Sequence, residues 1–116
     1  MSDSAVARNL TVHVDRSAEA AIVRCSGRLV AGVTDVLSVE VRQLIPSSKR
    51  VVLDLSDLTY MDSMGLGTVV RLYVSAMSSG CDLELVNVGR RIREMLGVTN
   101  LLSVFTIVGE HGIRMP

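Results

Sequence analysis

Residues 62–67, with the sequence DSMGLG, are the part of this 116-residue chain whose residue types and spacing could carry chemistry. They follow an apolar run with a polar loop and precede apolar residues at helical spacing. Ser63 therefore falls where the chain enters a helix, beside backbone N–H groups that lack partners and at the positive end of the helix dipole. A serine there can cap the helix, and a phosphate attached to it would be electrostatically favoured.

The residues after Ser63 suggest a contact surface. Gly65 and Gly67 keep the first helical turn bare, so a second protein can approach closely, and Met64 and Leu66 offer small apolar contacts. On the residues alone, a plain helix cap beside two packing glycines is an equally good interpretation. The segment is not a P-loop, because it lacks the Gly-Lys-Ser/Thr ending. It is not a nucleophile elbow either, because Gly-x-Ser-x-Gly is absent.

The elements that must position this segment follow from hydrophobic spacing. Alternating strands and helices predict an α/β fold with a largely parallel sheet and crossover helices. Pro46 is expected to end the first helix and Gly80 the second. Residues 56–62 are expected to form a loop. We predict strands at 9–14, 20–25, 50–55, 81–86 and 104–108, and helices at 36–45, 64–77 and 89–97.

Three predicted strands carry a charge at the parity opposite to their apolar residues: Arg24, Asp54 and Glu84. Strands buried on both faces would instead be apolar throughout. One face of the sheet should therefore be apolar under the helices, and the other should be open or thinly covered. We expect a mostly parallel, mixed sheet of about five strands with helices mainly on one face. A doubly wound nucleotide-binding sheet does not fit this pattern.

Composition excludes several functions. One Phe, two Tyr and no Trp leave few rings to stack on bases. Twelve basic residues balance twelve acidic ones, so no global field would attract DNA or an anionic membrane. The cluster of Arg90, Arg91 and Arg93 is interpreted as a solvated or partner-facing helix surface rather than a nucleic-acid patch. Without a signal peptide or a membrane-spanning stretch, we expect one cytoplasmic domain over residues 1–116.

No metal or cofactor site is expected. Cys25 and Cys81 are interpreted as reduced core thiols, since no Cys/His spacing suggests a metal. A Mg²⁺ site could be drawn from Asp54, Asp57 and Asp62, but these residues belong to a strand and a turn, and their side chains need not converge.

An enzyme that uses Ser63 as its nucleophile would need a base within reach. The two histidines, His13 and His111, are separated by most of the chain, and neither is obviously near Ser63. His13 has the polar parity of its strand and is interpreted as an exposed strand histidine. We expect no enzymatic activity.

The segment MDSMGLG, after VVLDLSDLTY and before a helix, resembles the signature of the STAS domain family, named for sulfate transporters and anti-sigma factor antagonists. The resemblance runs over nearly the whole chain. Further marks are SGRL at 26–29, the run from 83 to 101, and the closing VFTIV. It implies a sheet with helices mainly on one side, in agreement with the charge pattern.

The bacterial antagonists in this family are phosphorylated on the serine after the aspartate, which is Ser63 here. The resemblance implies that the unphosphorylated chain binds an anti-sigma factor serine/threonine kinase and frees a sigma factor. Phosphorylation would end binding, and a metal-dependent serine phosphatase would reset the cycle. The kinase would bring the ATP. The contact rim implied by this match consists of Asp62, Met64, Gly65, Leu66 and Gly67.

One position departs from the family pattern. Antagonists often carry an acidic residue after Gly-x-Leu, whereas Gly27-Arg28-Leu29 is followed here by Val30. A divergent partner and an unmodified Ser63 both remain open. The resemblance also implies a second hypothesis, a non-covalent STAS scaffold or regulatory subunit of a signalling or transport complex, because such domains serve in these roles too.

Overall fold

A computed structural model of the chain describes residues 2–7, 9–98, 106–108 and 112–114. Its helices are α1 (Thr34–Leu44), α2 (Ser63–Ser78) and α3 (Arg90–Val98), with a 3₁₀ turn at Ile45–Ser47. Its strands are β1 (Ser2–Ala7), β2 (Leu10–Arg16), β3 (Ala20–Leu29), β4 (Arg50–Met61), β5 (Asp82–Val86), β6 (Thr106–Val108) and β7 (Gly112–Arg114).

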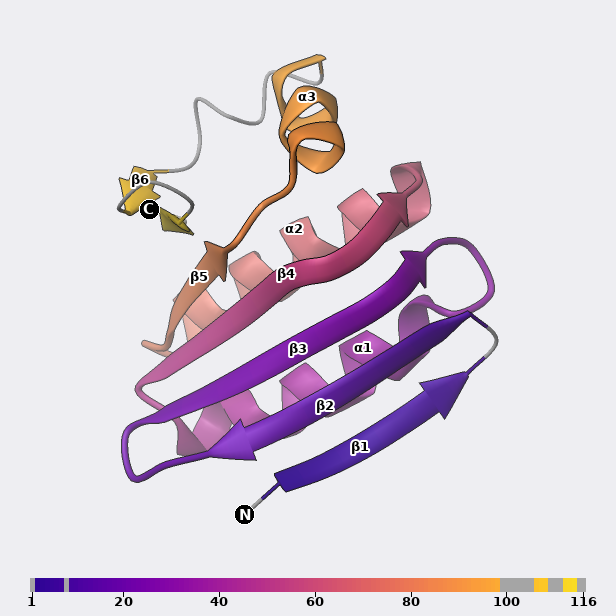
Figure 1. Cartoon of the computed structure of the whole chain (residues 1–116). Coiled ribbons are helices and arrows are strands. Elements are labelled where there is room, and N and C mark those ends of the chain that lie inside the picture. The colour runs from indigo at the N-terminus through magenta and orange to yellow at the C-terminus, as the bar shows by residue number, and fades with distance from the viewer. Residues whose placement is uncertain (1, 8, 99–105, 109–111, 115–116) are drawn as a thin grey trace.

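The strands form one mixed sheet in the order β1-β2-β3-β4-β5-β7-β6. The central strands β3, β4 and β5 run parallel, and the other neighbours pair antiparallel. Helices α1 and α2 lie side by side behind the sheet in Figure 1. The predicted mixed sheet with helices mainly on one face is confirmed. Over the residues that the structure describes, it is less parallel than expected and has seven strands rather than about five, because hairpin-type neighbours extend both sides of the parallel centre.

Two added strands explain the difference in number. β1 arises from the polar start of the chain and pairs along its whole length with β2. β7 comes from the tail and pairs with both β5 and β6. Backbone hydrogen bonds hold such strands in place, and these bonds leave no apolar pattern in the sequence. Of the predicted last strand, residues 104 and 105 lie outside the described residues.

The predicted loop at residues 56–62 is wrong, because β4 continues to Met61. β3 likewise continues through Ser26 and Gly27 to Leu29. The register of the two strands shifts twice, between Arg24 and Ser26 and between Gly27 and Arg28. Such bulges break the two-residue alternation that identifies a strand in a sequence.

Gly27 is required at the second bulge. Its φ of 104° is in the region that favours glycine. A side chain there would also collide with the carbonyl oxygen of Asn9. That carbonyl instead accepts a hydrogen bond of 2.7 Å from the Arg28 N–H, which ties the β1–β2 turn to β3.

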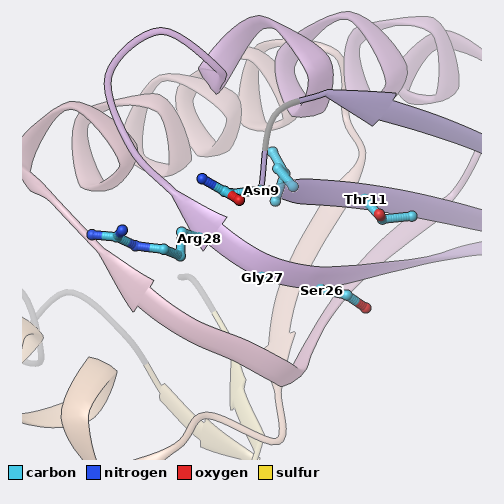
Figure 2. A pocket seen from close by; sticks show the side chains of 6 residues that line it. Asn9, Thr11, Ser26, Gly27 and Arg28 are labelled. Atoms are coloured by element: carbon cyan, nitrogen blue, oxygen red, sulfur yellow. The ribbon is translucent and has the colours of Figure 1, made fainter.

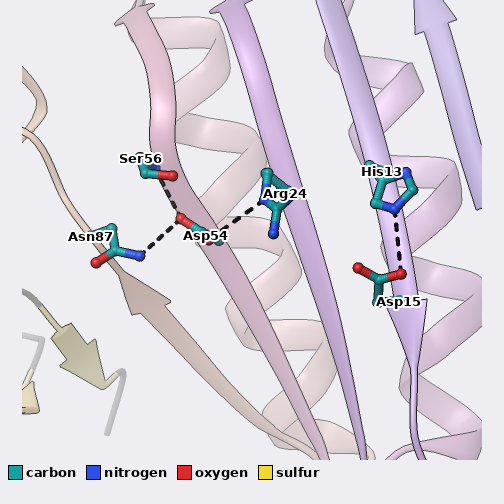
Figure 3. A network of polar contacts seen from close by, with 6 residues as sticks. All are labelled: His13, Asp15, Arg24, Asp54, Ser56 and Asn87. Carbon is teal, nitrogen blue, oxygen red and sulfur yellow. Dashed lines mark hydrogen bonds and ion pairs between the residues drawn. The ribbon is translucent and has the colours of Figure 1, made fainter. Parts of the chain in front are cut away.

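An aliphatic core fills the space between the sheet and the helices, as predicted. The charged positions of β3 and β4 lie on the opposite face (Figure 3). There the Asp54 carboxylate accepts hydrogen bonds from Ser56 N (3.0 Å) and Asn87 Nδ2 (3.1 Å), and it lies 3.8 Å from Arg24 Nε. Glu84 is only 5% exposed, so this face is more covered at β5 than expected. The buried core includes Val23, Leu37, Val41, Leu53, Leu66, Val69, Leu72, Leu83 and Leu85.

The network around Asp54 keeps this carboxyl ionised. Partial burial alone would raise its pKa. The hydrogen bonds from Ser56 and Asn87, together with the Arg24 charge, outweigh burial and lower the pKa of Asp54 below its ordinary value.

Among the described residues, none of the helices is long and apolar enough to cross a bilayer.

Cys25 and Cys81 are buried free thiols, as predicted. Burial, with a smaller contribution from the Asp54 charge, raises the pKa of Cys25 to about 12. Since the thiolate is the reactive form, Cys25 should resist iodoacetamide at pH 8 in the folded protein and react after unfolding in guanidinium chloride. Intact mass with peptide mapping measures this. Alkylation of folded Cys25 at the rate of an unstructured cysteine peptide would contradict it.

Candidate functional site

The candidate site lies where β4 ends and α2 begins. Asp62, in extended conformation, is the N-cap of α2, and its Oδ1 accepts a hydrogen bond of 2.9 Å from the Gly65 N–H. Ser63 is the first residue of the helix. The expectation that Ser63 caps the helix is therefore wrong. Aspartate is an equally good cap, and its charge also complements the positive helix end.

The Asp62 carboxylate also joins two loops. Its Oδ2 accepts a hydrogen bond of 2.9 Å from the Ala31 N–H, in the loop between β3 and α1. The Asp62 N–H donates to the Leu29 carbonyl at 3.2 Å. Hydrogen bonds from Ala31 and then Gly65 lower the pKa of Asp62. Asp62 thus fixes the start of α2 against the end of β3.

Gly65 and Leu66 face inward. A side chain at Gly65 would collide with the Leu29 carbonyl oxygen and reach 2.9 Å from Met61 Cγ. Leu66 is 6% exposed and belongs to the core. Gly65 therefore serves close packing of α2 on β3, and the side chain of Leu66 is not offered to a partner.

Ser63, Met64 and Gly67 form the outward part of the segment. Ser63 is exposed, and its hydroxyl makes no hydrogen bond with the described part of the chain. Met64 is 53% exposed. Gly67 is half-buried, and the atom nearest to a side chain placed there is Arg71 Nη1, at 3.4 Å. A free hydroxyl thus stands at the first helical turn beside an exposed apolar side chain.

Sequence reasoning missed the cluster beside this segment. The Arg28 guanidinium lies 5.1 Å from the centre of the Tyr60 ring, and Thr59 Oγ1 donates to the Gly27 carbonyl at 2.9 Å. A shallow hollow of about 410 Å³ lies next to these two contacts (Figure 2). The strand predicted at residues 20–25 stops short of Ser26 and Gly27, so sequence reasoning did not place these residues beside the candidate segment. The hollow is lined by Asn9, Leu10, Thr11, Ser26, Gly27 and Arg28.

The other residues considered from the sequence lie elsewhere. His13 is partly exposed on β2, where its ring contacts Ser4 Oγ (2.8 Å) and Asp15 Oδ1 (3.3 Å). His111 lies outside the described residues. Within the described ranges, no three His, Cys, Asp or Glu side chains are grouped to hold a metal ion. Arg90 and Arg91 are exposed on α3, and Arg90 Nε pairs with Glu94 at 3.1 Å.

Residues 10–112 match the family model of the STAS domain. The chain belongs to this family. It is 26% identical over 101 residues to the anti-sigma F factor antagonist of Paenibacillus polymyxa, a match covering 85% of this chain and 86% of the relative. It is 31% identical over 83 residues to the anti-sigma-B factor antagonist of Bacillus subtilis (strain 168), a match covering 67% of this chain and 76% of the relative.

Solved structures share the fold of this STAS domain. An anti-sigma factor antagonist from Mycobacterium paratuberculosis superposes with a TM-score of 0.75 at 20% identity, covering 87% of this chain and 86% of that one. The anti-sigma factor antagonist SpoIIAA in its unphosphorylated form superposes with a TM-score of 0.68 at 17% identity, covering 78% of this chain and 81% of that one. The predicted STAS-like architecture is thereby confirmed.

The two glycines of the segment should respond oppositely to alanine. Gly65→Ala should lower the free energy of unfolding by about 2–3 kcal/mol, because its Cβ overpacks against the Leu29 backbone. Gly67→Ala should be neutral or stabilise by up to about 1 kcal/mol through helix propensity, since only a flexible arginine lies near. Urea denaturation measures both values. Equal losses in the two variants would contradict the inward and outward assignment.

Asp62 should make stability depend on acid pH. Because its folded-state pKa is lowered, its ionised form stabilises the fold above the unfolded pKa of about 4, and this contribution is lost as pH falls through the folded value. The stability advantage of the wild-type protein over Asp62→Asn should therefore shrink between about pH 5 and pH 2. Urea titrations across this range measure it. A pH-independent difference would show that the carboxylate charge is irrelevant.

Proposed function

We propose that this chain is an anti-sigma factor antagonist controlled by phosphorylation. Unmodified, it sequesters an anti-sigma serine/threonine kinase and so frees a sigma factor in the cytoplasm; phosphorylated on Ser63, it releases the kinase. The observation that carries the proposal is the exposed Ser63 hydroxyl, free of hydrogen bonds with the described residues, at the first turn of α2 in a STAS fold. The names of the two relatives in Paenibacillus polymyxa and Bacillus subtilis support the same function.

The chemistry of the modification assigns different roles to the two proteins. Transfer from ATP forms a bond between Ser63 Oγ and the γ-phosphorus and breaks the bond from that phosphorus to the β,γ-bridging oxygen, releasing ADP. The hydroxyl proton must pass to a base. Asp62 is a poor base, because its pKa is lowered and both of its oxygens already accept hydrogen bonds. The base and the nucleotide therefore belong to the kinase, and this chain is the substrate and not an enzyme.

The phosphate is large enough to act as the switch. Weakening a nanomolar complex to micromolar requires about 4 kcal/mol. A phosphate carries a charge of about −1.5 to −2. Placed about 6 Å from one carboxylate of the partner, at an effective dielectric of about 20, it costs about 5 kcal/mol. No refolding is required, since Ser63 is already exposed at the positive end of α2.

The proposed contact rim divides into two parts. Met64 and Gly67 face outward beside Ser63 and would touch the kinase directly. Asp62, Gly65 and Leu66 would act by holding the first turn of α2 in place through the cap, the close packing and the core. An exposed phosphate at this place would also be open to a metal-dependent serine phosphatase, which we propose resets the cycle.

One observation keeps a second function in view. Val30 packs against the core where antagonists often carry an acidic residue, so this position offers no charge to a kinase. A non-covalent regulatory or scaffold subunit is the alternative. Parts of two transport proteins share the fold: 67% of a sulfate transporter family protein from Wolinella succinogenes (TM-score 0.62, 22% identity) and 14% of the mouse anion transporter Slc26a9 (TM-score 0.64, 18% identity). Purification from the host separates the two functions, since a kinase co-purifies in the first and a transport component in the second.

A charge at position 63 should weaken binding to the host's anti-sigma kinase. Ser63→Asp should raise the Kd by about 100-fold, because one charge about 6 Å from a partner carboxylate costs about 3 kcal/mol. Ser63→Ala should bind but accept no phosphate. Isothermal titration calorimetry and intact mass after incubation with kinase and ATP measure these effects.

Ser78→Asp is the matched control for this experiment, because it adds the same charge at the far end of the same helix. It should change the Kd by no more than about threefold. Full affinity in Ser63→Asp, or an equal loss in Ser78→Asp, would count against Ser63 as the switch.

A further inference from the structure

Arg71 lies on the same stripe of α2 as the switch serine. Ser63, Gly67 and Arg71 are separated by four residues each, so they follow one another along one side of the helix. Ser63 and Arg71 are exposed, and Gly67 between them has no side chain. Gly67 therefore places no side chain between the Ser63 hydroxyl and the Arg71 guanidinium on this side of the helix.

The Arg71 side chain is folded back toward Ser63. Its Nη2 donates to Thr68 Oγ1 at 3.1 Å, and its Nη1 lies 3.4 Å from the position of a Cβ at Gly67. Thr68 is buried, and its hydroxyl in turn donates to the Met64 carbonyl at 2.9 Å. The guanidinium therefore lies along the helix, one turn short of Ser63, and a buried threonine holds it there.

This guanidinium has no acidic partner among the described residues. Arg71 is the sole charged residue of α2, and no carboxylate within the described ranges pairs with it. Four of its five N–H groups thus remain available. Arginine forms its strongest contacts with carboxylates and phosphates, through two parallel hydrogen bonds.

We propose that Arg71 is the intramolecular partner of the phosphate on Ser63. This inference rests on the proposed function, since it concerns the phosphorylated form. Ser63 and Arg71 are eight residues apart, about 12 Å along the helix axis at 1.5 Å per residue, and the guanidinium already reaches back over Gly67, about half of this distance. The length of a phosphoserine side chain, together with a rotation of the Arg71 side chain away from Thr68, closes the remaining gap.

Such a pair would make phosphorylation act in two ways at once. The phosphate adds negative charge at the contact rim, and it also withdraws an exposed positive charge from the outer face of α2.

Two other charged groups, Asp62 and Arg28, lie at the same end of the domain as Ser63. Asp62 repels the phosphate, and Arg28 is held over the Tyr60 ring on β3 and β4.

The test uses protein with phosphoserine incorporated at position 63 during translation, so that no kinase is needed. The midpoint of the phosphate titration near pH 6 is followed by ³¹P NMR. An arginine nearby favours the dianion. Arg71→Gln should therefore raise the midpoint by about 0.5 pH units, as expected for an exposed ion pair, and 0.5 M NaCl should shrink the difference.

Arg42→Gln is the matched control, since Arg42 is exposed in the last turn of α1, and it should leave the midpoint unchanged. An unchanged midpoint in Arg71→Gln, or a larger effect of Arg28→Gln, would overturn the inference. Kinase binding of the phosphorylated and unmodified proteins is measured separately. Equal binding would refute the proposed function without altering the titration, so the two failures are distinguishable.

Discussion

The geometry of the candidate site depends on the Asp62 carboxylate. One of its oxygens caps α2 through the Gly65 N–H, and the other holds the Ala31 N–H in the loop after β3. Two segments that are distant in sequence are therefore joined by one ionised group, which the positive helix end also favours. Ser63 comes directly after this anchor, so its hydroxyl is presented from a fixed first turn rather than from a loose loop. Without the anchor, the first turn of α2 would lose both its cap and its link to the loop after β3.

Much of the fold could be predicted because it depends on apolar spacing. Apolar side chains gather on one face of each element, and this pattern predicts the central strands and the three helices. It also predicts that Arg24 and Asp54 lie on the sheet face away from the helices. The added strands β1 and β7 could not be predicted, since they depend on backbone pairing. The length of β4 was missed because two bulges within it disturb the alternation.

The candidate site was found from the sequence, but the roles within it were only partly assigned. Ser63 and Met64 are exposed as expected, whereas the cap belongs to Asp62. Serine and aspartate are equally good helix caps, so the sequence does not show which of two neighbouring residues is the cap. The backbone conformation decides it, because Asp62 is extended whereas Ser63 is already helical. Leu66 was placed in the rim because a short motif does not reveal which side of a helix packs inward. The amide of Ala31 has no signature at all, since every residue but proline carries one.

The alternation of inward and outward residues in the first turns of α2 separates stability from recognition. Gly65 and Leu66 are tied to the packing of the domain, while Met64 and Gly67 bear little on it. In a host with several such pairs of proteins, the outward positions could diverge by mutation without endangering folding. New side chains there could then repel the wrong kinase while the buried half of the motif stayed the same. One short segment can thus keep a common architecture and still insulate parallel signalling circuits from one another.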